Sequence, residues 1–262
     1  MSVSAAQFFA EYARHRAEEG RALHGDELRS LPYLRAGPLA RQWSVRARSF
    51  ETLISKIINP MAAKKRLDIL DLGAGNGWLC YRLARFGHRA VALDIRDDES
   101  DGLGAACDLL TGANHQFERI AASFENLPFE TRSFDIVIFN ASLHYATNLG
   151  RAIAEAERVI RRRGMIAILD SPFYASEREG ERMVAEKMAQ GAARFGARAE
   201  ILLSQNFLEF LTREKLEKAL PSLTWIRHRV RYPLWYEMRP LLAQFKGKRS
   251  PSRFDVWSAR VS

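Results

Sequence analysis

The chain of 262 residues lacks long apolar runs and contains little cysteine. No stretch approaches the roughly 18 uninterrupted apolar residues that a membrane-spanning helix needs, so we expect no membrane span. The first 20 residues turn charged at once and contain no apolar core of the signal-peptide kind, which predicts a cytoplasmic protein. The two cysteines, Cys80 and Cys107, have neither metal-binding nor redox spacing, and we expect reduced thiols.

Acidic residues are too few to balance the basic ones. The chain has 40 Lys and Arg against 31 Asp and Glu, a net charge of +9. The excess is concentrated in residues 213–253, where eleven Lys and Arg face three Glu, a local balance of +8. Such a region attracts RNA, an anionic lipid surface or a phosphorylated metabolite, or it simply keeps one face solvated. Charge alone does not choose among these.

Apolar runs alternate with helical patterns in the order that a parallel sheet requires. Strands are expected at 67–72, 89–94, 115–121, 134–140 and 165–170, followed by two more at about 222–232 and 254–261. Helices are expected at 77–86, about 101–111 and 148–161. The last of these would end in the three arginines at 161–163, placed at the negative end of the helix dipole before Gly164. The pattern predicts an α/β fold.

Two further regions lie outside this alternation. Residues 1–60 are predicted to form an N-terminal helical cap, with two helices separated by the loop 31–38. Residues 61–262 would form the main domain, interrupted by a helical insert at about 173–211 whose charged helix covers 176–195. Thr212 is the expected N-cap of the helix that follows the insert.

The most informative stretch is residues 67–78, which indicates a buried strand, a glycine-rich turn and a helix. A dinucleotide fingerprint counted from Gly73 and Gly75 would have its third glycine at position 78, where this chain has Trp78. Asp71 before the turn would repel a pyrophosphate but attract a cationic head group. S-adenosylmethionine carries an ammonium and a sulfonium, and it fits. Asp94 lies 19 residues beyond Gly75, near the spacing expected of an acid that holds ribose hydroxyls.

Three later segments extend the argument: Val91-Ala92-Leu93-Asp94, residues 125–137 and residues 156–168. With the glycine-rich turn, and in this order, they resemble the class I S-adenosylmethionine-dependent methyltransferases, in particular the small-molecule, type 11-like branch. The resemblance covers residues 64–171 well and the C-terminal third loosely. It implies a Rossmann-like, seven-stranded, mostly parallel sheet with an antiparallel last strand, helices on both faces, and S-adenosylmethionine as cofactor.

The cofactor site implied by the residues and the resemblance runs along the ends of four strands. The family often has an acid before the position of Phe124, to bind the adenine amino group, and this chain has Ser123 there. The Phe124 ring would sandwich adenine or belong to the core, and both readings stay open. The full set of candidate cofactor residues is Asp71, Gly73, Ala74, Gly75, Asn76, Gly77, Asp94, Ile95, Ser123, Phe124 and Asn140.

On the acceptor side, His144 is the best-placed candidate for a general base, although a single histidine after a strand often has a structural role. Five aromatic residues are candidates for the acceptor pocket or for the core: Tyr33, Trp43, Tyr145, Phe173 and Tyr174. No metal is expected. The acidic run 97–101 fits helix N-terminal charging, and the fourth and fifth strands end in Asn140 and Asp170, an incomplete ligand set.

Residues 140–143, Asn-Ala-Ser-Leu, do not form the Asn-Pro-Pro-aromatic turn of nucleic-acid amino methyltransferases. The leading hypothesis is therefore in-line methyl transfer to a small-molecule or lipid-type acceptor. An RNA methyltransferase that uses the basic region 213–253 is the second hypothesis. A non-catalytic cofactor-binding partner protein is the third and an NAD-dependent enzyme the fourth. The acceptor atom and the oligomeric state stay open.

Overall fold

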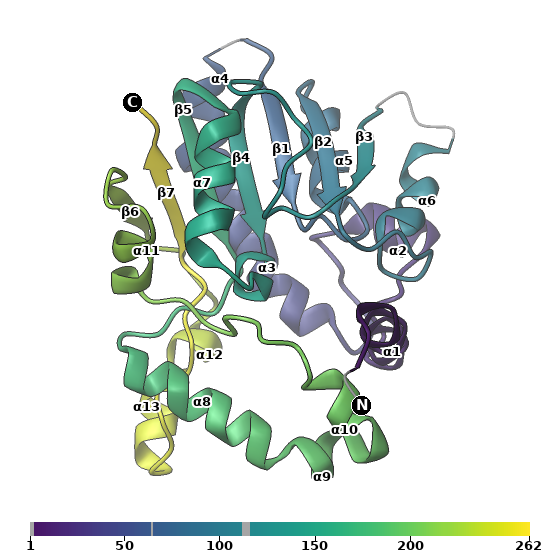
Figure 1. Cartoon of the computed structure of the whole chain (residues 1–262), viewed down its shortest axis with the longest axis vertical. Coiled ribbons are helices and arrows are strands. Elements are labelled where there is room, and N and C mark those ends of the chain that lie inside the picture. The colour runs from purple at the N-terminus through teal and green to yellow at the C-terminus, as the bar shows by residue number, and fades with distance from the viewer. Residues whose placement is uncertain (1–2, 64, 112–115) are drawn as a thin grey trace.

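The computed structural model describes residues 3–63, 65–111 and 116–262. Its centre is a seven-stranded sheet with strand order β3-β2-β1-β4-β5-β7-β6 (Figure 1). Strands β1 to β5 pair in parallel, and β7 is antiparallel to both of its neighbours, β5 and β6. This confirms the predicted fold class. The strands are β1 (Asp68–Leu72), β2 (Arg89–Asp94), β3 (Glu118–Ala121), β4 (Phe134–Asn140), β5 (Ile160–Leu169), β6 (Trp225–His228) and β7 (Val256–Arg260).

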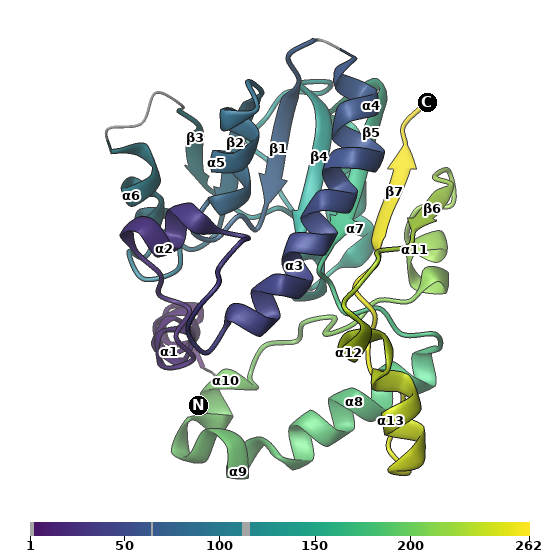
Figure 2. The same cartoon turned by 180° about the vertical axis from the view of Figure 1, so that it is seen from behind.

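Helices cover both faces of the sheet. Helices α3 (Ala40–Leu53) and α5 (Trp78–Arg85) cover one face, and α7 (Leu149–Val159) and α11 (Arg213–Ala219) cover the other (Figures 1 and 2). Because side chains alternate along a strand, Ile69 of β1 packs on the α3 side while Leu70 packs on the α7 side. The central strands are buried on both faces, and their sequences are therefore continuous apolar runs.

The remaining helices are short or lie beyond the ends of the strands. Helices α8 (Glu177–Ala189), α9 (Gly191–Phe195) and α10 (Ala199–Leu202) lie past the carboxyl ends of the parallel strands, together with α1 (Ala5–Glu18), α12 (Leu234–Glu237) and α13 (Arg239–Phe245) (Figures 1 and 2). Helix α1 contacts α10 although the two are far apart in sequence. The others are α2 (Gly25–Ser30), α4 (Asn59–Ala62) and α6 (Cys107–Leu110).

The fifth strand corrects one prediction. Helix α7 ends at Val159, and β5 begins at Ile160, so the arginines at 161–163 lie in the strand rather than at a helix end. Ile160 is buried and pairs with Phe134, and the register then shifts before Ile136 pairs with Met165. The guanidinium of Arg161 lies 2.6 Å from Asp68 Oδ2. Carboxylates of neighbouring strands, not the helix dipole, neutralise this basic residue.

Other boundaries differ in smaller ways. The predicted strand 115–121 begins at Glu118, and His115 falls outside the described residues. The predicted helix 101–111 consists of a 3-10 turn, Leu103–Ala106, followed by α6. The insert helix predicted over 176–195 divides into α8 and α9, with Ser176 as N-cap of the first. Thr212 caps α11 as expected, because its side chain accepts a hydrogen bond from the Lys215 backbone N–H.

The N-terminal 60 residues contain three helices and a π-helical turn, Ile54–Ile58, where two helices were expected. Phe50 and Leu53 of α3 are buried in the same cluster as Ile69 of the sheet. The N-terminal segment therefore shares the core of the α/β unit, and a separate cap ending at residue 60 stays a prediction. No helix among the described segments is long and apolar enough to cross a membrane.

Candidate functional site

A cavity of about 570 Å³ lies at the carboxyl ends of the parallel strands. Its walls come from α1, α3, the glycine-rich turn after β1, the segments after β2, β3, β4 and β5, and residues 205–207 near the end of the insert. Eight of the residues singled out from the sequence line it. They are Gly73, Gly75, Asp94, Ile95, Ser123, Phe124, His144 and Tyr145.

A smaller cavity of about 70 Å³ adjoins the first and shares Gly73, Gly75 and several arginines with it. It extends under the glycine-rich turn toward α3. Four other predicted residues line it, namely Trp43, Ala74, Asn76 and Asn140. Trp43 therefore lies beside the turn that was assigned to the cofactor, away from the predicted acceptor side.

The glycine-rich turn depends on left-handed backbone conformations. Gly73 has a φ of +72°, and a Cβ there would lie 2.3 Å from Ser142 Cβ. Gly77 has a φ of +73°, and a Cβ there would lie 2.9 Å from the Phe117 ring. Side chains of the protein itself therefore exclude larger residues at both positions.

Asp94 lies at the end of β2 and faces the large cavity. Its Oδ2 accepts a hydrogen bond from the Gly75 backbone N–H at 2.8 Å, and its Oδ1 accepts one from the Arg96 backbone N–H at 2.9 Å. Burial raises the pKa of this carboxyl, although the two backbone bonds oppose the shift. A carboxylate oriented by two backbone donors beside a cavity is suited to accept the hydroxyls of a ribose.

Asp71 occupies a different environment from the one expected. Its side chain is fully buried, lines neither cavity, and leaves Oδ1 without a hydrogen-bond partner. Burial, with repulsion from Asp94 as the next cause, raises its pKa to about 8. Neither cavity reaches this carboxylate, so its interaction with an ammonium group, directly or through water, stays a prediction.

Arginines around the two cavities were missed in the sequence. Arg16 of α1 and Arg46 of α3 line both cavities. Arg16 Nε lies 2.6 Å from Asp101 Oδ2, while Arg46 Nε lies 3.0 Å from Asp170 Oδ2 and its Nη2 donates to Asn140 Oδ1 at 3.0 Å. These guanidiniums can hold a carboxylate of the methionine type. The sequence does contain a signal for Arg16, because Phe8, Tyr12 and Arg16 recur every four residues along one face of a helix.

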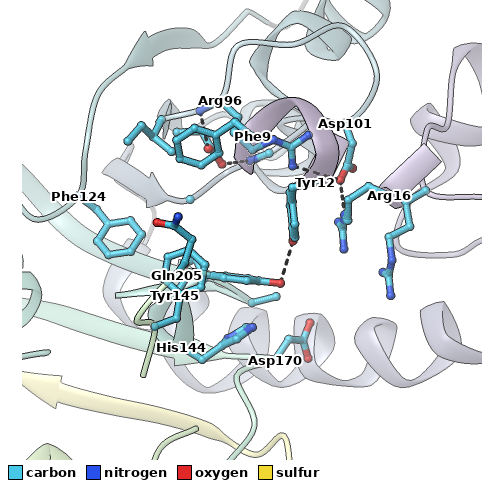
Figure 3. Close-up of a pocket in the computed structure, with 18 of the residues that line it drawn as sticks. Phe9, Tyr12, Arg16, Arg96, Asp101, Phe124, His144, Tyr145, Asp170 and Gln205 are labelled. Atoms are coloured by element: carbon cyan, nitrogen blue, oxygen red, sulfur yellow. Dashed lines mark hydrogen bonds and ion pairs between the residues drawn. The ribbon is translucent and has the colours of Figure 1, made fainter. Parts of the chain in front are cut away.

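Aromatic side chains form the opposite wall of the large cavity. Tyr12 of α1 and Tyr145, after β4, point toward each other, and their hydroxyls are 2.8 Å apart (Figure 3). Phe207 packs edge-on against Tyr145 with a centroid distance of 5.4 Å and against Phe8 at 5.6 Å. Phe124, after β3, also lines the cavity and lies edge-on to Phe139 of the core at 5.8 Å. This wall can hold an apolar group and offers two hydroxyls to orient it.

His144 faces the large cavity but is not poised as a strong base. Its Nδ1 lies 3.3 Å from Ser171 Oγ. Burial, with Lys187 as the next cause, lowers its pKa to about 3. The imidazole is therefore neutral at ordinary pH and can accept or donate one hydrogen bond toward the cavity.

The other predicted acceptor residues lie elsewhere. Tyr33 is partly exposed and packs against Phe50. Phe173 stacks on Trp257 in the core, and the Tyr174 hydroxyl accepts a hydrogen bond from Arg249. None of the three lines either cavity, since each is held by packing or bonding away from the ends of β1 and β4. Within the described residues, no cluster of acids, histidines and cysteines is arranged to hold a metal ion.

Comparison with known proteins agrees with this geometry. Residues 70–168 match the family described as a methyltransferase domain. The sterol 4-C-methyltransferase strm-1 of Caenorhabditis elegans is 25% identical over 122 residues, which is 47% of this chain and 36% of that protein. The chain spans less than half the length of the curated relatives that it matches.

Solved structures share the fold. The PH0226 protein of Pyrococcus horikoshii superposes with a TM-score of 0.58 at 17% identity, over 88% of this chain and 98% of that one. The plantazolicin methyltransferase BpumL, solved in complex with SAH, superposes with a TM-score of 0.51 at 14% identity, over 97% of this chain and 99% of that one. Residues 70–168 therefore resemble a methyltransferase domain in sequence, and the whole chain shares the fold of these solved structures.

Proposed function

We propose that the protein transfers the methyl group of S-adenosylmethionine to an apolar small-molecule or lipid-type acceptor held against the aromatic wall of the large cavity. The observation that carries the proposal is the continuity of this cavity, which extends from Asp94 and Gly75 to Tyr145 and Phe207. Its volume of about 570 Å³ lies within the range of roughly 300–1,000 Å³ that is typical of ligand pockets.

Different residues of the site fit different parts of the cofactor. Asp94 would receive the ribose hydroxyls, and Ser123 and Phe124 would contact the adenine. Arg16 and Arg46, beside the glycine-rich turn, would hold the methionine carboxylate. When bound, the cofactor supplies an electrophilic methyl group on a sulfonium. The protein's part is then to align the acceptor and to exclude water.

The acceptor side favours an apolar molecule that carries one hydrogen-bonding group. Phe8, Phe207 and Tyr145 provide the apolar contacts, and the Tyr12–Tyr145 hydroxyl pair is held within the cavity wall. His144, oriented by Ser171, would bind the acceptor hydroxyl or amine as a neutral hydrogen-bonding partner. A pKa of about 3 makes it a weak base, so its role is to position the nucleophilic atom more than to remove its proton.

The test is methyl transfer to a panel of sterol, acyl-chain, phenolic and small polar amine acceptors, followed by release of S-adenosylhomocysteine. We expect turnover with apolar acceptors, and Phe207→Ala should raise KM by about ten-fold or more because a large buried apolar contact is lost. Phe9→Ala, on the same cavity, is a matched aromatic variant on α1. Turnover confined to the polar amines would contradict the proposed acceptor class.

His144→Gln separates positioning from base catalysis in the same assay. The glutamine keeps a hydrogen-bonding group but removes the titratable one. We expect a fall in kcat of less than about ten-fold and no change in the pH profile between pH 5 and 8. The loss of an acidic limb from the pH profile in this variant would instead identify His144 as the general base.

A further inference from the structure

The helical segment formed by α12 and α13 has an apolar stripe that faces solvent. Leu234, Met238, Leu241, Leu242 and Phe245 are all large, apolar and exposed. In the sequence their positions follow the spacing i, i+4, i+7, i+8 and i+11 that is typical of one face of an amphipathic helix, and in the structure they are divided between α12 and α13 on either side of Met238. Such a face ordinarily packs on a core, yet here Phe245 is 89% exposed and Leu234 is 77% exposed.

The opposite side of the segment holds it to the body of the protein. Tyr236 is buried and packs against Tyr232 with a centroid distance of 4.5 Å. Arg41 of α3 lies over the Trp235 ring at 4.0 Å. These contacts hold α12 to the body, whereas α13 has no buried residue and continues the apolar stripe outward, at the end of the molecule that also holds the cavity (Figures 1 and 2).

Basic residues flank the stripe in the sequence. Residues 229–248 contain five Lys and Arg and one Glu, a local charge of +4. The basic members are Arg229, Arg231, Arg239, Lys246 and Lys248, and we call these five together with the five apolar residues the C-terminal patch. Apolar side chains flanked by Lys and Arg are the composition of helices that lie in the interface of an anionic membrane.

We propose that the C-terminal patch docks the protein on an anionic lipid surface. The stripe would insert its apolar side chains at the boundary between head groups and acyl chains, while the basic residues contact the head groups. Charge excludes the simplest alternative, because a second copy of the chain would place one +4 surface against another. Shape disfavours a rigid protein partner. The stripe protrudes, and the cavity beside Tyr236 and Arg239 measures only about 20 Å³, too small to receive a partner side chain.

Docking by this surface places the end of the molecule that holds the cavity nearest to the lipid. The proposal is independent of the identity of the acceptor, because it concerns binding and not turnover. A failure to detect methyl transfer would therefore not contradict the docking proposal, and a failure to detect vesicle binding would not contradict the proposed reaction.

The experiment is co-sedimentation of the full chain with vesicles of phosphatidylcholine alone and of phosphatidylcholine mixed with phosphatidylglycerol. We expect binding to the mixed vesicles at low salt, weakened by high salt and absent with phosphatidylcholine alone. Phe245→Ser should weaken binding by about ten-fold and Lys246→Gln by about five-fold. Both side chains are exposed, so the thermal midpoint and S-adenosylhomocysteine binding should not change.

Two matched variants complete the test. Ile226→Ser removes an exposed apolar side chain from the edge strand β6, and Lys56→Gln removes an exposed charge from the π-helical turn after α3. Neither should change vesicle binding. The proposal is overturned by equal losses in the patch and control variants, or by no binding to the mixed vesicles at low salt. Two other results would also overturn the proposal. One is a dimer, detected by light scattering, that the Phe245→Ser substitution dissociates. The other is binding of the protein to polyglutamate with the same affinity as to the mixed vesicles.

Discussion

The two walls of the large cavity are built in opposite ways. The cofactor wall comes mainly from one stretch of chain, residues 73–124, in which successive strands deliver their last residues to the same edge of the sheet, and Arg16 and Arg46 add to it from α1 and α3. The acceptor wall joins α1 to segments that lie far from it in sequence. Tyr12 meets Tyr145, and Arg198 of the insert lies 3.0 Å from Glu11 and 2.7 Å from Glu18 of α1. The cofactor site can therefore stay the same when the distant segments that form the acceptor wall change and alter the acceptor that is bound.

The largest effect is expected on the cofactor wall. Asp94→Ala should weaken S-adenosylhomocysteine binding by about 100-fold, because hydrogen bonds from both ribose hydroxyls to a carboxylate are lost. Isothermal titration calorimetry measures the change. Asp97→Ala, an exposed acid three residues later, is the matched control and should bind normally. Unchanged affinity in Asp94→Ala would show that the ribose is held elsewhere.

A smaller effect is expected beneath that wall, at Asp71. Its folded-state pKa of about 8 is above the usual value near 4, so the native state keeps a proton that the unfolded chain releases. The free energy of unfolding therefore falls as pH rises from about 4 to about 8, by at most about 1.4 kcal/mol per pH unit from this group. Asp71→Asn should remove this slope. Urea unfolding at pH 6, 7 and 8 measures it.

The control for this measurement is Asp97→Asn, which changes an exposed carboxyl and should keep the slope of the unchanged protein. Parallel slopes in Asp71→Asn and the unchanged protein would mean that Asp71 ionises normally when buried. The result also bears on the cofactor, because a neutral Asp71 cannot attract an ammonium group at pH 7.

The smallest effect is expected on the acceptor wall. Arg198→Ala removes the ion pairs of Arg198 with Glu11 and Glu18 of α1, and we expect S-adenosylhomocysteine to dissociate about two- to five-fold faster, with little change in the thermal midpoint. Stopped-flow fluorescence measures the rate. Arg213→Ala removes an exposed ion pair to Glu217 within α11 and serves as control. Equal dissociation rates in all three proteins would show that α1 and the insert do not restrict exit from the cavity.

The difference between the walls also explains which of the predicted residues lie together. Gly73, Asp94 and Phe124 line one cavity because parallel strands bring their carboxyl ends to one edge, so order along the chain predicts proximity, while their roles stay predictions. Tyr33, Phe173 and Tyr174 were plausible by the same reasoning, but packing and hydrogen bonds direct their side chains elsewhere. For the arginines at 161–163, the buried pairing of Ile160 with Phe134 prevailed over the helix-end pattern.

Local sequence by itself determined the succession of strands along the chain, the glycine-rich turn and the position of Asp94, because these follow from apolar periodicity and from short-range spacing. The tertiary structure alone decided three other features. It joined α1 to the insert across the acceptor wall, buried Asp71 beneath the turn, and left the stripe from Leu234 to Phe245 facing solvent. Each depends on contacts between segments distant in the chain, whose free energies leave no period or motif in the sequence.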